Sequence, residues 1–100
     1  MDQIENLELL EMAAKAAGYD YRPQNRAIVT DGIPSNWNPL SDDGDALRLA
    51  VYLFRDIHFW YFDNSVSVGN ERRVVCGDDP CAATRLAIVR AAAEIGSALK

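Results

Sequence analysis

Hydrophobic residues recur every three to four positions in three stretches of the chain, which is the spacing of one helix face. The stretches are residues 4–17, 42–54 and 80–98. Gly18 follows the first stretch as an expected C-cap, and acidic residues begin the other two, where free amide groups favour them. The second stretch has a wide apolar arc, because Leu47 and Val51 broaden it. We expect this helix to pack against more than one neighbour.

Runs rich in β-branched and aromatic residues predict strands between the helices. The runs are residues 27–30, 57–62, 65–68 and 72–76. The last three are joined by turns too short for a parallel crossover, so they predict an antiparallel meander. Alternation in 65–68 predicts one buried face and one solvated face, whereas 57–62 is apolar on both faces and predicts helical cover on both. Residues 31–42 are expected to form the longest irregular stretch.

These elements predict one α+β domain over residues 1–100, in the order helix, strand, helix, meander, helix. We expect three helices packed around a small antiparallel sheet, in an arrangement similar to an α/β/α sandwich. The expected core includes Leu10, Ile28, Leu49, Leu53, Phe59, Val66, Ile88 and Ile95.

Composition and charge narrow the function classes. The chain is 49% hydrophobic with a formal net charge of -5. A negative surplus disfavours direct binding to nucleic acid or to an anionic membrane. No apolar run approaches the ~18–20 residues of a membrane span. The acidic start, Met1-Asp2-Gln3, is unlike a secretory leader, so we expect two reduced, free cysteines.

Chemistry-bearing residues do not form a coherent catalytic or metal-binding motif. Asp42, Asp43 and Asp45 lack the glycine and glutamate spacing of a calcium-binding EF-hand loop, and helix capping explains them. Cys76 and Cys81 are too few for a structural zinc site, and we expect two small buried thiols. We therefore expect no catalytic residues, no cofactor and no bound metal. A thiol-dependent enzyme that uses these cysteines with His58, the one histidine, stays an alternative.

One resemblance covers most of the chain in element order. The segment from Trp37-Asn38-Pro39-Leu40 through Val51, followed by Asp79-Pro80 and residues 83–93, resembles small uncharacterised phage and prophage proteins. These look similar to the phage ABA (α/β/α) sandwich domains. The resemblance implies a fold, a phage setting and the host cytoplasm. It implies no activity and no catalytic residues.

The resulting hypothesis is a small acidic phage accessory protein that binds a host or phage protein. It could inhibit a bacterial defence system such as a CRISPR complex; a minor structural or morphogenesis protein is the alternative. The expected partner surface is basic, of the kind that normally holds nucleic acid. The expected contact residues are Glu5, Glu8, Glu11, Trp37, Asp42, Asp43 and Asp45. Trp37 could instead plug the core, and the acids could serve solubility and capping.

Overall fold

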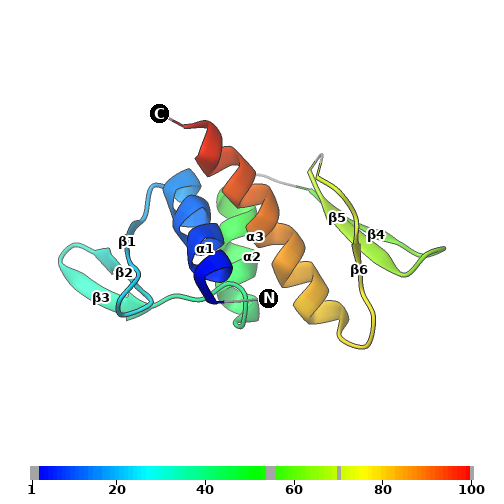
Figure 1. Ribbon diagram of the computed structural model, residues 1–100, viewed down its shortest axis with the longest axis horizontal. Coiled ribbons are helices and arrows are strands. Elements are labelled where there is room, and N and C mark those ends of the chain that lie inside the picture. Colours follow the sequence, from blue (N-terminus) through cyan, green and yellow to red (C-terminus); the bar gives the residue numbers. More distant parts are fainter. Residues whose placement is uncertain (1–2, 54–55, 70, 100) are drawn as a thin grey trace.

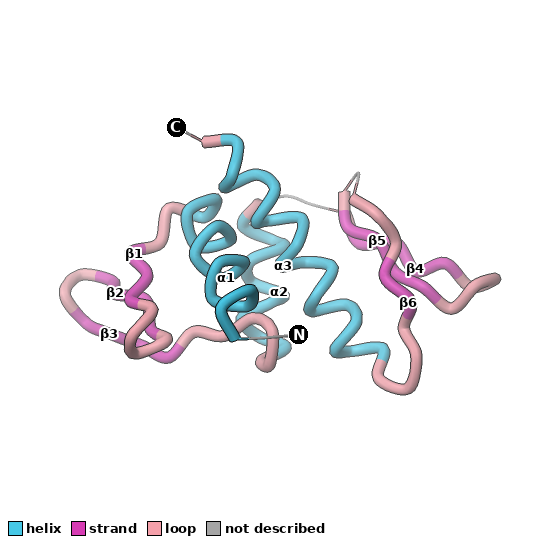
Figure 2. The backbone as a smooth tube through the Cα atoms, in the orientation of Figure 1, coloured by secondary structure: helices cyan, strands magenta, loops and turns pink. Residues whose placement is uncertain are grey.

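The described part of the chain, residues 3–53, 56–69 and 71–99 of a computed structural model, forms three helices and two antiparallel sheets. The elements are α1 (Gln3–Ala17), β1 (Asp20–Arg22), β2 (Ala27–Thr30), β3 (Ile33–Asn36), α2 (Asp43–Tyr52), β4 (Ile57–Trp60), β5 (Ser65–Val68), β6 (Val74–Val75) and α3 (Pro80–Ala98). Figure 2 marks them along the backbone. The α+β class and the three helices are confirmed.

The helices lie in the middle of the molecule, with one small sheet on each side (Figure 1). The molecule measures 45 × 25 × 22 Å, and its long axis runs from sheet to sheet. The single sheet expected from the sequence is therefore two sheets, ordered β1-β2-β3 and β4-β5-β6. Helices separate the two sheets, so the layers differ from those of an α/β/α sandwich.

The first sheet exists because the chain reverses at Asp31 and Gly32. Both residues have positive φ, 53° and 80°, as a two-residue hairpin turn requires. The turn brings β3 back along β2, so that Thr30 pairs with Ile33. The prediction of an irregular stretch over 31–42 is wrong for β3. Pro34 is tolerated there because β3 is an edge strand.

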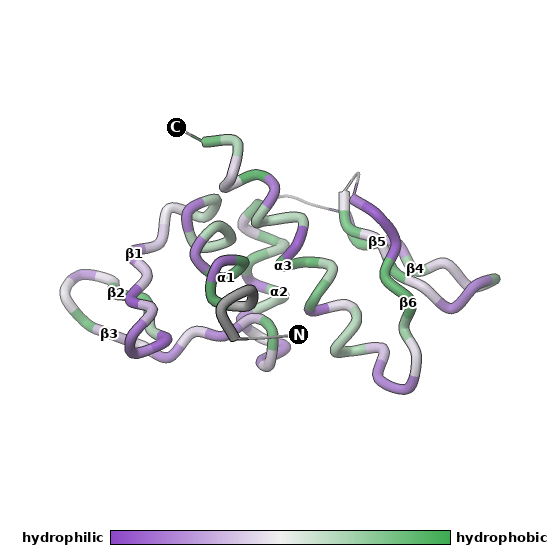
Figure 3. The backbone as a smooth tube through the Cα atoms, in the orientation of Figure 1, coloured by the Kyte–Doolittle hydropathy of each residue, from purple (hydrophilic) through white to green (hydrophobic). Residues whose placement is uncertain are grey.

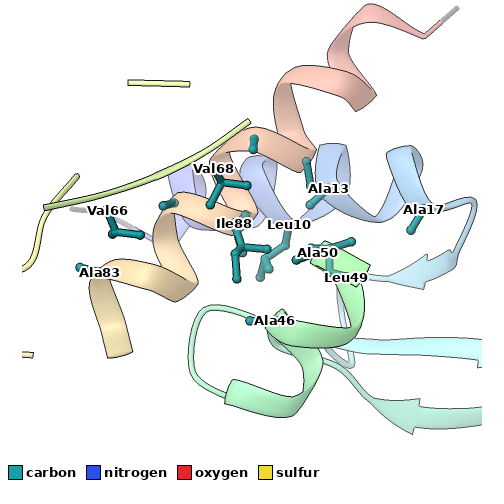
Figure 4. Packing of buried hydrophobic residues seen from close by; sticks show 14 of the residues in the cluster. Leu10, Ala13, Ala17, Ala46, Leu49, Ala50, Val66, Val68, Ala83 and Ile88 are labelled. Carbon is teal, nitrogen blue, oxygen red and sulfur yellow. The ribbon is translucent and has the colours of Figure 1, made fainter. Parts of the chain in front are cut away.

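The second sheet packs on α3 through β5. Val66 and Val68 are fully buried and lie against the α3 face that carries Ile88 (Figure 4). Ser65 and Ser67 on the other face are buried as well, so the predicted solvated face is wrong. Neighbouring side chains of the same hairpin cover the face that carries these serines.

Most of the predicted core is confirmed. Leu10, Leu49, Val66 and Ile88 are buried, while Ile28, Leu53 and Ile95 are partly buried. Phe59 is exposed, and its placement in the core is wrong. Figure 3 shows hydrophobic stretches along α2 and α3 and on β5 and β6 beside them. The described core is thus centred on the helices.

Helix starts follow the predicted capping chemistry. The Asp42 carboxylate accepts a hydrogen bond from the Asp45 amide at 2.8 Å, and Asp79 accepts one from the Ala82 amide at 3.0 Å. Pro80 follows Asp79 at the start of α3, where its missing N–H costs nothing. Gly18 has a φ of 73°, the left-handed conformation expected of a C-cap.

Candidate functional site

An apolar groove lies between α2, α3 and β4, with a volume of about 420 Å³. We call it the α2–β4 groove. Ala46 and Leu47 come from α2, Ile57 and Phe59 from β4, and Ile88 from α3. The groove forms because β5 and β6 pack on α3, while β4 lies at the outer edge of the sheet. The face of β4 that the sequence predicted to be covered therefore stays open.

Further large apolar side chains are exposed on the elements that form the groove, and Tyr61 and Phe62 line a second pocket that shares Phe59 and Pro80 with it. Val51, one helical turn after Leu47, is 63% exposed on α2. Phe59 is also 63% exposed, and Tyr61 and Phe62 at the turn after β4 are 92% and 97% exposed. The groove and these side chains are here called the α2–β4 surface. The prediction that the wide apolar arc packs this helix on more than one neighbour fails at Leu47 and Val51, because both are exposed.

Charged groups at the groove are paired. Arg85 donates from one guanidinium nitrogen to the Asp43 carboxylate, and its Nε donates to the Leu40 carbonyl at 2.9 Å. These bonds fasten the start of α2 and the loop before it to α3. The groove therefore carries neutralised charge on one wall and apolar side chains elsewhere, which suits an apolar occupant.

The outer face of the second sheet is covered by a stack of side chains from β4 and from the chain just before β6. The Trp60 indole donates from Nε1 to Ser67 Oγ at 2.9 Å and lies 4.1 Å, centroid to centroid, from the His58 ring. The Arg73 guanidinium lies 3.6 Å from the centroid of the Trp60 ring. This arrangement covers Ser67 and links β4 to β5 and to the chain before β6.

Asp63 fixes the turn that carries the exposed aromatics. Its carboxylate accepts from Ser65 Oγ and from Arg73, each at 2.6 Å. The Ser65 hydrogen bond, and then the Arg73 pair, lower the pKa of the exposed Asp63 carboxyl. Tyr61 and Phe62 therefore lie on a turn that these two hydrogen bonds stabilise.

The residues of the thiol-enzyme alternative do not converge. Cys81 is exposed and lines the groove, whereas Cys76 is buried, and both thiols are free. The expectation that both are buried is therefore wrong for Cys81. His58 lies on the opposite face of β4 from Ile57 and Phe59, stacked on Trp60. A Cys81–His58 nucleophile pair is not formed in this structure.

Trp37 belongs to the core. It is only 3% exposed, and the rings of Tyr19 and Tyr21 meet it edge-on with centroids 5.6 and 5.5 Å away. The Trp37 amide also donates to the Arg26 carbonyl at 3.0 Å. Trp37 therefore plugs the space between the first sheet and the helices. The prediction of an exposed anchor for a partner is wrong at this residue.

The acidic cluster at the start of α2 is engaged within the chain. Asp42 caps the helix, and Asp43 pairs with Arg85. Asp45 accepts from the Asn38 amide at 2.9 Å and pairs with Arg48 at 2.8 Å. Capping and internal pairing account for all three carboxylates.

The first-helix acids are placed only in part. Glu8 and Glu11 are exposed on α1, and neither forms an ion pair with another residue that the structure describes. The side chain of Glu5 lies outside the described residues. The role of these three acids in partner binding stays a prediction.

Neither a metal cluster nor a membrane span is found where the structure is described. Across 3–53, 56–69 and 71–99, His, Cys, Asp and Glu do not gather in threes as a metal ion would need. No helix in those ranges combines the length and hydrophobicity needed to cross a membrane.

Comparison with known proteins does not suggest a function, so the proposal for this protein starts from its exposed surface. No known protein family, curated protein or solved structure matches the chain. The fold defines a small α+β domain in which three helices separate two antiparallel sheets. Among the described residues, the α2–β4 surface is a feature that packing does not explain.

Sequence reasoning missed the residues that make up this surface. Phe59 was expected in the core, and Tyr61 and Phe62 were expected in a covered strand. One signal could have placed the last two: they stand directly before Asp63-Asn64, a turn pair, and therefore at a hairpin tip. Whether Phe59 is exposed depends on how far α3 extends over the second sheet. The sequence pattern does not encode this.

Proposed function

We propose that this protein works by binding another protein through the α2–β4 surface. The observation that carries the proposal is the group of exposed apolar side chains beside an apolar groove, led by Phe59, Tyr61 and Phe62. Exposed apolar surface of this kind is costly to leave in water and is typical of protein-binding sites. Aromatic side chains are also the usual anchors of such interfaces.

The geometry suits recognition by shape more than recognition by charge. The groove charges are paired, and the aromatics stand on a turn braced by Asp63. A rigid apolar surface loses little conformational entropy on binding, so more of the buried area contributes to affinity. The net charge of -5 still favours encounter with a basic partner.

The sequence resemblance of residues 37–51 and 79–93 to small phage and prophage proteins, although the layers are not those of an ABA sandwich, supports a proposal for the kind of partner. We infer a host or phage protein, and inhibition of a bacterial defence complex is the specific form to test first. A minor structural or morphogenesis role is the second form, and it predicts that the protein is found in purified phage particles.

A capture experiment with paired variants tests the binding proposal. Val51→Glu puts a charge on the α2–β4 surface, and Ile33→Glu puts the same charge on the first sheet, where Ile33 is 69% exposed. Both sites are exposed, so both variants should fold. We expect wild type and Ile33→Glu to capture the same partner from host lysate, and Val51→Glu to lose it. Equal capture by both variants contradicts the proposed surface.

A plating assay tests the inhibitor form separately. Expression in a host that carries an active defence complex should restore phage plating if the protein inhibits that complex, and Val51→Glu should not restore it. Binding without any restoration contradicts the inhibitor form and leaves the binding proposal standing.

A further inference from the structure

We propose that β4 pairs antiparallel with β4 of a second copy of this chain, with the two Phe59 residues facing each other across a two-fold axis. The inference rests on the proposed function, because it names a second copy as the occupant at the β4 end of the α2–β4 surface. In the dimer Phe59, Tyr61 and Phe62 contact the second copy, so another protein would bind at the α2 end of the surface, where Leu47 and Val51 stay exposed.

The outer edge of β4 is open for pairing. β4 is the edge strand of the order β4-β5-β6 and bonds only to β5 along its length. Among described residues, the outward backbone groups of Ile57–Trp60 form no backbone hydrogen bond with another element. The strand also lacks lysine and proline, which usually protect exposed edges. An unprotected edge with apolar side chains is a template for another strand.

A two-fold axis perpendicular to the sheet fixes which residues can meet. It places one residue opposite its own copy and keeps each sheet face continuous across the dimer. With Phe59 on the axis, Ile57 lies opposite Tyr61 of the second copy, the first residue after β4. His58 faces Trp60 of the second copy on the outer side. Apolar residues therefore meet apolar residues, and aromatic rings meet aromatic rings.

The exposed aromatic area approaches the lower limit for a specific dimer. Phe59, Tyr61 and Phe62 expose most of their side chains, roughly 500 Å² per copy at about 200 Å² for each full aromatic residue. Two copies could thus remove about 1,000 Å² from water before the groove walls are counted, which is near the lower limit of specific interfaces. Covering Phe59 alone would not reach that limit.

The two ion pairs beside β4 do not oppose the pairing, although each copy carries a net charge of -5 and Asp56, directly before the strand, is exposed. Asp63 is paired with Arg73 beside the turn, and Asp43 is paired with Arg85 on the groove wall. Pairing through β4 therefore buries no lone charge from these four residues, which would otherwise be costly.

Sedimentation equilibrium at micromolar concentrations tests the dimer. Phe59→Lys charges the proposed edge, and Val75→Lys is the matched control on β6, the other edge of the same sheet, where Val75 is 73% exposed. We expect wild type and Val75→Lys to dimerise alike. Phe59→Lys should raise the dissociation constant at least tenfold. A monomeric wild type, or equal dimerisation by both lysine variants, overturns the proposal.

A cross-link tests the register. In a Cys81→Ser background, which removes the exposed thiol, Phe59→Cys should form an intermolecular disulfide under mild oxidation. Val75→Cys in the same background should stay largely monomeric. Cross-linking of both variants at the same rate, or of neither, contradicts the Phe59 axis.

Failure of this inference differs from failure of the proposed function. A monomeric wild type that still captures a partner through Val51 overturns the dimer alone. A dimer that captures no partner keeps the β4 pairing and contradicts the wider binding role.

Discussion

Gly96 of α3 lies directly against the backbone of Met12 in α1. A methyl group added at Gly96 would come within 1.8 Å of the Met12 carbonyl oxygen. Alanines line both helices at this contact, including Ala13 and Ala92, which are buried. The two helices can approach this closely because their contact is made by small residues, and this pair forms the centre of the fold.

Gly96→Ala should therefore destabilise the protein. Alanine would favour the helix by about 1 kcal/mol, but the clash with backbone atoms should cost more, giving a net loss of about 1–3 kcal/mol. Urea unfolding measures the difference. Gly44→Ala is the control, because an added methyl there meets only side-chain ends of Arg48 and Asp42 at 3.2 Å. A Gly96→Ala protein as stable as Gly44→Ala would contradict the close packing.

Leu49 and Val51 test which face of α2 is structural. Leu49 is fully buried and Val51 is 63% exposed, although only one residue separates them. Leu49→Ala should lower the free energy of unfolding by about 2–5 kcal/mol, as expected for a cavity in a core. Val51→Ala should change it by about 0.5 kcal/mol or less. A large loss at Val51 would mean that the α2–β4 surface is part of the packed core.

Local chemistry explains how much of the fold was predictable. Helix ends were predictable because Gly18, Asp42 and Asp79 satisfy backbone groups next to them in sequence. The meander was predictable because its turns are short. The first sheet was missed although Asp31-Gly32 is a strong hairpin signal, since Pro34 and Ser35 have low strand propensity and the turn alone creates β3.

The functional surface was less predictable for a different reason. Apolar and aromatic residues on both faces of β4 indicate that both faces can be buried, but tertiary packing decides what covers them. α3 covers Val66 and Val68 in β5 and leaves Phe59 open. The sequence suggested that the acidic residues contact a partner. Asp42 and Asp45 instead stabilise the start of α2 and the loop before it. Only the three-dimensional arrangement separates these roles.

Tyr21→Phe should leave stability unchanged or raise it slightly. The Tyr21 hydroxyl is buried and finds no hydrogen-bond partner among the described residues, and burial raises the pKa of this phenol. Removing a buried, unpaired polar group is neutral or favourable by up to about 1 kcal/mol. Thermal unfolding measures the change. Destabilisation above about 1 kcal/mol would show that the hydroxyl is satisfied in the folded protein.

Asp63 should titrate below its ordinary pKa of 3.8, because Ser65 and then Arg73 stabilise its carboxylate. A lowered folded-state pKa means that this contribution to stability is present above pH 3.8 and is lost as the pH falls through the lower folded value. Carboxyl NMR titration should show the lowered midpoint. Ser65→Ala should move it back toward 3.8. An unchanged midpoint in that variant would contradict the assigned cause.

Cys81 gives the most direct test of the α2–β4 surface as a protein-binding site, because its exposed thiol lines the groove. The measurement is the alkylation rate of Cys81 at constant protein concentration, with and without a saturating amount of the captured partner. Buried Cys76 serves as the internal control for folding. The account predicts that partner binding slows Cys81 alkylation at least tenfold and leaves Cys76 unreactive. An unchanged Cys81 rate in an intact complex would contradict it.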